Sequence, residues 1–335
     1  MSKNPQSTAY IYASTRVRAL EGGMIGRDRI AQLADAENMD ELYARLEEYG
    51  VTLARDEGGV QIEPALQGLL KRVLDDISEC APEPALFDFL RYPYDCHNIK
   101  AAIKCHIRGL SAREMMFDLG TADPEAVVSM PALGDYAALP AEMAKAAPLA
   151  MQAYEKTGNP RVIDVILDKA CFADMLSCAR RGGEAFHVQL VQARIDLINL
   201  MMCLRLARMD AGEQGRLLLD QALLDGGLLD KAALLGAYVE GEGAILSLLR
   251  RTPYEKLEQS IAASDGTASS AERLADDYRM ALIREAKHVI YGAPVLSAYF
   301  YAQEYAVRNI RIVVAAKKAG LAAEIIHERI RTSYV

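Results

Sequence analysis

Apolar residues recur along this chain at the spacing of an α-helix for most of its length. The clearest example is the stretch 62–79, where apolar side chains follow one another at intervals of three and four residues: Leu66, Leu69, Leu70, Val73, Leu74 and Ile77. These intervals place the apolar side chains on one side of a helix. We see no convincing strand in the sequence, so the pattern predicts an all-α fold.

One helical sequence occurs three times, and each copy is aligned on an asparagine. Asn98, Asn199 and Asn309 lie roughly one hundred residues apart, a period that suits a small domain better than a solenoid repeat. Each asparagine is followed by Ile or Leu and, five positions on, by another apolar residue. Other positions are shared by two copies: an aspartate three residues before the asparagine and a base two residues after it (Asp95 and Asp196; Lys100 and Arg311).

The helices predicted around these copies form three cycles. In each cycle a pair of short helices is followed by a long antiparallel helical hairpin. The predicted domains are residues 1–110, 111–212 and 213–335. In the first cycle we expect a long helix over 85–110 that is kinked at Pro93, because proline removes a backbone donor. In the second cycle we expect a helix over 111–119.

The asparagines are unusual in a helix that is otherwise apolar. Asparagine is a poor helix former, and a buried amide needs hydrogen-bond partners. We therefore interpret each asparagine, with Asp95 or Asp196 where present, as a structural residue that ties its long helix to a neighbouring helix. A ligand-binding role for three equivalent asparagines is the alternative.

Composition narrows the possible classes of function. The chain has 335 residues, a net charge of −8 and a pI near 5.3, which argues against nucleic acid as the main partner because phosphate binding needs a clustered basic surface. No window is long and apolar enough to span a membrane, and the first ten residues have no apolar core typical of a secretory signal. Six cysteines without paired spacing fit reduced thiols in a cytoplasm.

The sequence contains no catalytic signature. A Gly-rich phosphate loop ending in Gly-Lys-Ser/Thr, a G-x-S-x-G turn and an H-E-x-x-H motif are all missing. Two Cys-His pairs could suggest a metal, namely Cys96-His97 and Cys105-His106, but their spacing puts them on opposite faces of one predicted helix. We therefore predict no catalytic residue, no cofactor site and no metal site.

Several motifs in order resemble one known family. The stretch from Tyr10 to Leu20 reads YIYASTRVRAL, and the first asparagine copy follows it. The stretch from Asp164 to Leu176 reads DVILDKACFADML and precedes the second copy, and the third copy continues to Arg331-x-x-Tyr334-Val335. This ordered set resembles the C subunit of V-type (A/V-type) ATPases, which is called the d subunit in eukaryotes. The third copy departs from the pattern because Ala306 stands where an acidic residue is expected, with Glu304 nearby.

The resemblance implies a funnel-shaped protein of three pseudo-symmetric helical domains. It would be a non-catalytic central-stalk subunit of the rotor, placed between the axle of the catalytic head and the membrane ring of proteolipid subunits. It would transmit torque for proton or sodium transport coupled to ATP hydrolysis or synthesis. Its location would be cytoplasmic and peripheral, on the inner face of the membrane.

Two other functions remain open from the residues alone. One is a helical-repeat scaffold that binds another protein, and the other is an all-α enzyme with a site that the motifs do not reveal. If the chain is a coupling subunit, we expect partners to contact the short helix pairs. Candidate contacts are arginines that look exposed at equivalent places in these pairs: Arg27, Arg29, Arg113 and Arg216.

Overall fold

Helices account for nearly all regular structure in the computed structural model, which describes residues 8–56, 59–264 and 266–335. The predicted all-α fold class is confirmed. Within the described residues the exception is a small antiparallel sheet of β1 (Ala54–Asp56) and β2 (Gly59–Gln61), in which Arg55 lies opposite Val60. The sequence did not predict this sheet, because two strands of three mostly exposed residues leave no alternating pattern to detect.

The chain divides into two compact units, and the first combines both ends of the described chain. It contains the residues up to Pro84 together with Arg279–Val335. Its elements, besides the small sheet, are α2 (Ile11–Glu21), α3 (Arg27–Asp35), α4 (Met39–Glu48), α5 (Ile62–Cys80), η3 (Glu285–His288), α16 (Ala293–Lys318) and α17 (Ala323–Arg329).

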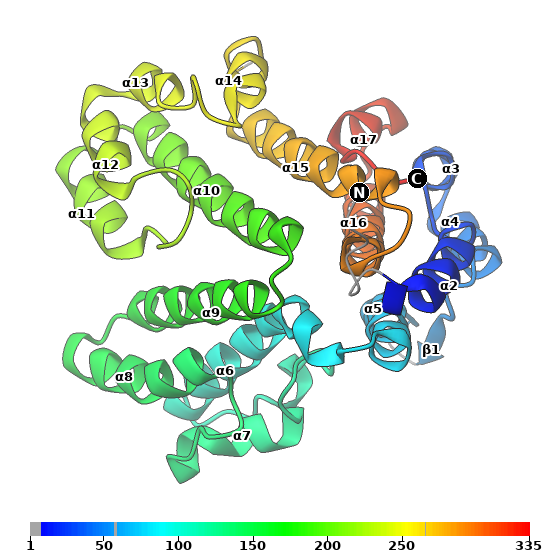
Figure 1. The fold of residues 1–335 in the computed structure, drawn as a ribbon, viewed down its shortest axis with the longest axis horizontal. Helices are drawn as coiled ribbons and strands as arrows, with labels where there is room; N and C mark the ends of the chain where they lie inside the picture. Colours follow the sequence, from blue (N-terminus) through cyan, green and yellow to red (C-terminus); the bar gives the residue numbers. More distant parts are fainter. Residues whose placement is uncertain (1–7, 57–58, 265) are drawn as a thin grey trace. The chain divides into compact units, whose positions relative to one another are not determined.

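The core of the first unit is built around α16. This helix is apolar on nearly all sides, with Val295, Tyr305 and Ile310 all inaccessible to solvent, as expected for a helix that is surrounded by others. The amphipathic helix α5 packs its leucine-rich face against α16, and α2, α3 and α17 pack against α16 as well (Figure 1). The predicted stripe of residues 66–77 is therefore the face of α5 that is buried in this core.

The second unit contains Ala85–Tyr278 and is also helical. Its elements are α6 (Tyr92–Ile107), η2 (Arg113–Met115), α7 (Pro124–Leu133), α8 (Ala141–Thr157), α9 (Arg161–Arg181), α10 (Ala185–Arg208), α11 (Gly212–Ala222), α12 (Lys231–Glu240), α13 (Glu242–Ser247) and α14 (Glu255–Ala262). Helices α8 and α9 form a hairpin, and α9 also packs against α6 and α10 (Figure 1). Helix η1 (Pro84–Leu90) and helix α15 (Ala268–Arg284) cross the boundaries of the two units.

Two predicted helices differ from the observed ones. Pro93 does not kink a helix over 85–110, because α6 begins only at Tyr92 and the proline lies in its first turn. Proline is tolerated there, since the backbone N–H groups of the first turn have no acceptor within the helix. The predicted helix 111–119 is reduced to the three residues of η2.

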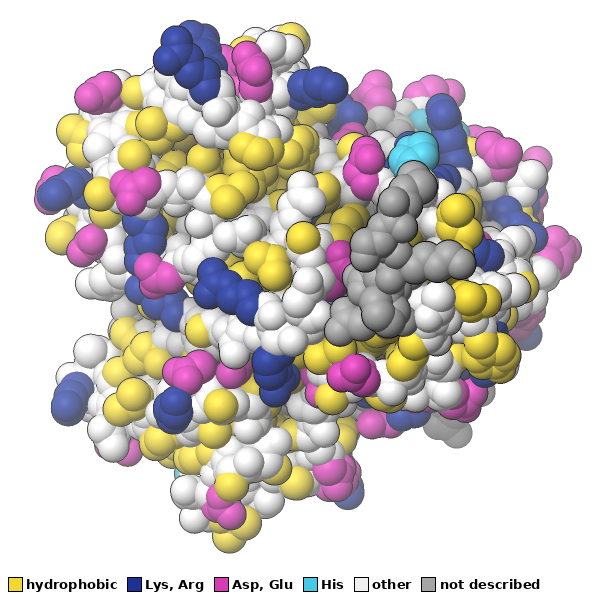
Figure 2. Space-filling model, in the orientation of Figure 1, with side chains coloured by type: hydrophobic (Ala, Val, Ile, Leu, Met, Phe, Trp, Pro, Cys, Tyr) yellow, Lys and Arg dark blue, Asp and Glu magenta, His cyan; other side chains and the backbone are white. Residues whose placement is uncertain are grey.

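The surface carries charges of both signs. On the face shown in Figure 2, Lys and Arg side chains are scattered among Asp and Glu side chains and do not gather in one area. Across the described part of the chain, none of the helices combines the length and the low charge needed to cross a bilayer.

Candidate functional site

The three asparagines make the same pair of hydrogen bonds. The side chain of Asn98 donates to the carbonyl oxygen of Phe117 at 2.8 Å and accepts from its N–H at 2.8 Å. Asn199 bonds the carbonyl and N–H of Leu224 at 2.9 and 2.8 Å, and Asn309 bonds those of Arg331 at 3.0 and 2.8 Å. Each asparagine is thus an amide clamp on both backbone groups of one residue.

These amide clamps correct one part of the sequence interpretation. The sequence predicted a tie to a neighbouring helix, whereas the bonded residues Phe117, Leu224 and Arg331 lie outside helices, in the connection that follows each long helix. The clamp therefore attaches a helix to an irregular segment, where backbone groups lack the partners that a helix would supply. All three asparagine side chains are buried, so both bonds are made without competition from water.

The aspartates hold the next residues of the same connections. Asp95 accepts hydrogen bonds from the N–H groups of Thr121 and Ala122 and from the Thr121 hydroxyl. Asp196 accepts from the N–H groups of Leu228 and Leu229 at 2.8 and 3.0 Å. In both copies the aspartate therefore binds the residues four and five positions after the one held by the asparagine. Burial raises the pKa of Asp95, and its hydrogen-bond donors oppose that shift.

A glycine lies against each of these carboxylates. A Cβ atom on Gly120 would lie 2.2 Å from Asp95 Oδ1, and one on Gly227 would lie 2.0 Å from Asp196 Oδ1. Both glycines stand three positions after the clamped residue, and any side chain there would displace the aspartate. The sequence did not reveal these glycines, because α11 lengthens the second connection and they fall at different distances from their asparagines.

In the first two copies the connection leads into a short helix, which begins at the same distance after the clamped residue. Asp123 and Asp230, six positions after the clamped residue, cap α7 and α12 through the N–H groups of Glu125 and Ala233. An aspartate in this place satisfies a donor that the helix itself leaves without an acceptor. Clamp, aspartate and cap together specify the path of each connection from its long helix to the following short one.

The third copy completes this path with a segment from the other end of the chain. The carbonyl of Val335, four positions after Arg331, accepts a hydrogen bond from the N–H of Arg27 at 2.9 Å, and Arg27 begins α3. Helix α3 packs against α16 just as α7 packs against α6 and α12 against α10. Therefore α3 has the place in the third copy that α7 and α12 have in the others.

The third copy lacks the aspartate, and it has a large residue at the position where the other two copies have glycine. Ala306 stands three positions before Asn309, and Tyr334 stands three positions after the clamped residue, where the other copies have glycine. Nearby Glu304 does not take the place of the aspartate, because its carboxylate lies 3.8 Å from the guanidinium of Arg279. That guanidinium is buried over the rings of Tyr301 and Tyr305.

The bases two positions after the asparagines join long helices through ion pairs. Lys100 on α6 lies 2.6 Å from Asp168 on α9, and Arg311 on α16 lies 2.8 Å from Glu63 on α5. The second copy has Met201 at this position. The Arg311 pair is largely exposed, so we assign it a small contribution to stability.

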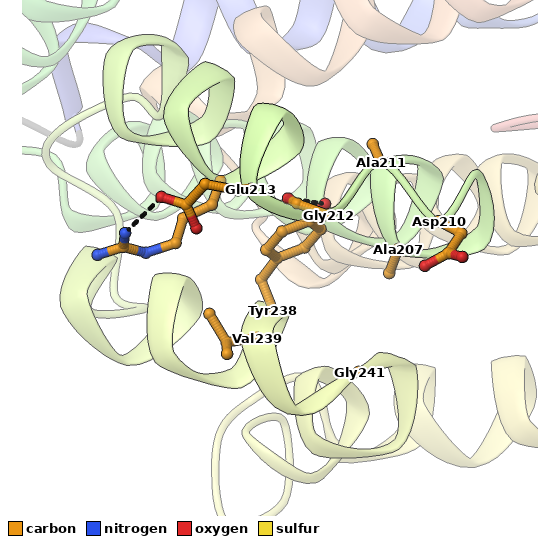
Figure 3. Close-up of a pocket in the computed structure, with 9 residues that line it drawn as sticks. Ala207, Asp210, Ala211, Gly212, Glu213, Tyr238, Val239 and Gly241 are labelled. Atoms are coloured by element: carbon orange, nitrogen blue, oxygen red, sulfur yellow. Dashed lines mark hydrogen bonds and ion pairs between the residues drawn. The ribbon is translucent and has the colours of Figure 1, made fainter.

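Three of the four candidate contact arginines have partners within the protein. Arg29 donates to the carbonyl groups of Gly23 and Met24, and Arg113 forms a two-point ion pair with Glu125 at 2.7 Å. Arg216 pairs with Glu213 at 3.0 Å, beside a hollow of about 280 Å³ between α10, α11 and α12 that Figure 3 shows with Tyr238 projecting into it. Arg27 is exposed at the start of α3.

The arginines do not occupy equivalent positions, contrary to the sequence prediction. Arg113 stands four residues before the clamped Phe117, Arg216 stands eight before Leu224, and the other two lie in α3. The reason is again the different length of the connections, which the alignment on asparagines did not show. The arginines remain candidates for partner contact as individual residues, not as a symmetric set.

The cysteines and histidines considered as metal ligands lie apart. Cys96 is buried between α6 and α9, where its thiol points at the carbonyl of Leu167, while His106 is exposed. Within the described residues no group of three or more His, Cys, Asp or Glu side chains is arranged to hold a metal ion.

Comparison with known proteins identifies the protein family to which this chain belongs. A model of the family described as ATP synthase (C/AC39) subunit matches residues 13–329, so the chain belongs to that family. It is 26% identical to the C subunit of the V-type sodium ATPase of Enterococcus hirae, over 95% of this chain and 97% of that protein. It is 25% identical to the C subunits of the A-type ATP synthases of Thermococcus kodakarensis (96% and 90% covered) and Methanosarcina mazei (98% and 94% covered). The family predicted from the motifs is confirmed.

The amide clamp can be tested by removing one side chain. Asn199→Ala should lower the free energy of unfolding by about 2–4 kcal/mol, because it leaves the buried N–H and carbonyl of Leu224 without their partners. The control is Gln259→Ala on an exposed position of α14, expected to stay within about 0.5 kcal/mol of the unchanged protein. Urea unfolding followed by circular dichroism measures both. If both substitutions changed the free energy of unfolding by the same small amount, the stabilising role of the clamp would be contradicted.

The close glycine contact can be tested against a second glycine of the same region. Gly227→Ala should destabilise the protein by about 3 kcal/mol, because the new methyl group would push Asp196 away from its two N–H donors. Gly236→Ala, inside α12 with open space around the new Cβ, should stabilise it by about 0.5–1 kcal/mol. Thermal unfolding measures both variants, and midpoints that move in the same direction would contradict the close contact at Gly227.

The accessibility of the thiols predicts their chemical reactivity. Burial raises the pKa of Cys203 to about 12 and also raises the pKa of Cys80, but Cys80 is only half-buried, at the end of α5, while the other five cysteines are buried. Because the thiolate is the reactive form, Cys203 should stay unmodified at pH 8 under native conditions, while Cys80 reacts first among the six. Alkylation followed by peptide mass spectrometry measures the order, with urea-unfolded protein as the reference in which all six react. Rapid native labelling of Cys203 would show that this part of α10 opens readily.

Proposed function

We propose that this chain is the non-catalytic central-stalk subunit of a V/A-type rotary ATPase. The observation that carries the proposal is the family match over residues 13–329, together with relatives named as C subunits that align over nearly their whole length. In this role the chain links the axle of the catalytic head to the proteolipid ring of the membrane. It transmits torque between them for proton or sodium transport coupled to ATP hydrolysis or synthesis.

The repeated architecture suits a mechanical role. Torque passes through a part only if its long helices keep their positions, and the amide clamps attach the middle of α6, α10 and α16 to the connections that follow. We propose that the three copies form three pseudo-equivalent domains around a funnel, with sequence boundaries near residues 110 and 212. The hydrogen-bond pattern common to the three copies supports this proposal.

We further propose that the subunit has no catalytic site of its own and takes no cofactor. It would work at the cytoplasmic, inner face of the membrane, as a peripheral part of the complex. Its partners would be proteins, not nucleic acid, in keeping with the net charge of −8 and the mixed charges of the surface in Figure 2.

The candidate arginines would contribute to attachment. Arg27 is exposed, and the ion pairs of Arg113 and Arg216 lie on the surface, where water already screens them. An exposed guanidinium can exchange such a partner for a carboxylate or carbonyl of another subunit at little cost.

The proposed role can be tested by copurification. A tagged chain expressed with the rest of its complex should bring down the axle subunits and the proteolipids from detergent-solubilised membranes. Changing Arg27, Arg29, Arg113 and Arg216 together to Glu should weaken recovery of at least one of these partners while circular dichroism shows an intact fold. A set of exposed bases elsewhere, Lys156, Arg251, Lys256 and Lys318, changed to Glu in the same way, is the control.

The results of this copurification test the stalk role and the arginine contacts independently. If the unchanged chain recovers neither the axle nor the ring, the stalk role is wrong and a scaffold for another protein becomes the better explanation. If the chain recovers both and the arginine variant does so equally well in moderate salt, the stalk role stands and these arginines are not its contacts.

A further inference from the structure

A groove of about 450 Å³ lies beside α6 in the second unit. One of its walls is a face of α6 that carries a basic or aromatic nitrogen on every turn: His97, Lys100, Lys104 and Arg108. The opposite walls come from Leu110 and Met115 in the following connection and from Asp164 on α9. We refer to this feature as the α6 groove.

The charge of the α6 groove differs from that of the protein as a whole. The chain carries −8, yet the lining of the groove has three cationic side chains and one carboxylate. Lys100 is largely committed to Asp168 at 2.6 Å and has only 19% of its side chain exposed. Lys104 pairs with Asp164 at 2.6 Å in a more open setting, with the two side chains 36% and 40% exposed, and Arg108 is exposed at the end of α6.

The surroundings of His97 lower the pKa of its imidazole. Burial is the main cause that lowers its pKa, and the charges of Lys100 and Lys104 lower it further. Its Nε2 lies 3.0 Å from the carbonyl oxygen of Met115, and its ring packs on Phe117, the residue clamped by Asn98. His97 is therefore fixed in place at one end of the groove, close to the bases, and will sense an anion that binds there.

Apolar side chains border the same groove. Leu110 is 60% exposed and Met115 is 55% exposed, although both are large and stand next to a cationic wall. A small inorganic anion would leave this apolar surface in contact with water. A protein segment that presents carboxylates on one side and an apolar residue beside them would cover both.

We propose that the α6 groove is a docking site for an acidic amphipathic segment of a partner protein. Carboxylates of the segment would pair with Arg108 and Lys104, and an apolar side chain would pack on Leu110 and Met115. The Lys104–Asp164 pair can open for this purpose at small cost, because both side chains are partly in water. The proposal rests on the chemistry of the groove and does not require the stalk role.

The test uses the full chain and designed peptides. The first peptide is a capped helix with Glu at positions i, i+4 and i+8 and Leu at i+3 and i+7, and the second has Lys in place of each Glu. Binding is followed by NMR of histidine-labelled protein, with the His97 signal assigned from a His97→Gln variant. The acidic peptide should shift the His97 signal to saturation, and the basic peptide should not.

Charge reversal then locates the site. Lys104→Glu with Arg108→Glu should weaken binding of the acidic peptide by about tenfold or more. The matched control, Arg251→Glu with Lys256→Glu, changes two exposed bases of the same unit outside the groove and should leave the affinity within about twofold. Circular dichroism verifies that both variants are folded.

Each remaining outcome overturns the proposal. If inorganic phosphate alone saturates the His97 shift as the acidic peptide does, the groove is a small-anion site. If the basic peptide binds as well as the acidic one, or the control variant loses as much affinity as the groove variant, the attraction is not specific to this surface. If the acidic peptide fails to shift His97, the groove does not dock such a segment.

Discussion

The path of the chain after each long helix depends on one interaction, the pairing of a buried asparagine amide with both backbone groups of a single residue. An asparagine side chain carries a donor and an acceptor side by side, so it can bond an N–H and a carbonyl as a neighbouring backbone would. No other side chain of its length does this, since aspartate only accepts when ionised and leucine does neither. Once Phe117, Leu224 or Arg331 is held, the positions of the following residues are largely determined, because the next bonds occur four to six residues further on.

The third copy shows how the same path tolerates other residues. Where the first two copies combine an aspartate with a glycine, the third combines Ala306 with Tyr334, so a small residue and a large one have exchanged places. The tyrosine is buried, and its hydroxyl lies within 3.4 Å of Arg18 from α2. The short helix that follows is supplied by α3, so the start and the end of the described chain meet in one unit through the Arg27–Val335 hydrogen bond.

The sequence predicted the all-α fold class because helical periodicity is a local property, and it predicted the family because several motifs resemble it in order. It did not predict the partner of each asparagine, since Phe117, Leu224 and Arg331 share no residue type and stand at different distances from their clamps. A clamp on backbone groups places no demand on the side chain of the clamped residue. For the same reason the packing of α5 on α16 could not be foreseen: the stripe on α5 shows that a face is buried, but not which helix covers it.

Buried polar contacts explain why α16 has a defined position in an otherwise apolar core. Leucine and valine side chains can pack against a helix in several registers with similar energy, whereas a buried polar group is satisfied in one. Such contacts occur in both halves of α16. Arg279 from α15 rests on Tyr301 and Tyr305 in its first half, and Asn309 holds Arg331 in its second half. A buried charge without its partner would be costly, so a shift of α16 by one turn would break contacts at both points together. Apolar burial therefore stabilises the unit, and these two contacts select one arrangement of its central helix.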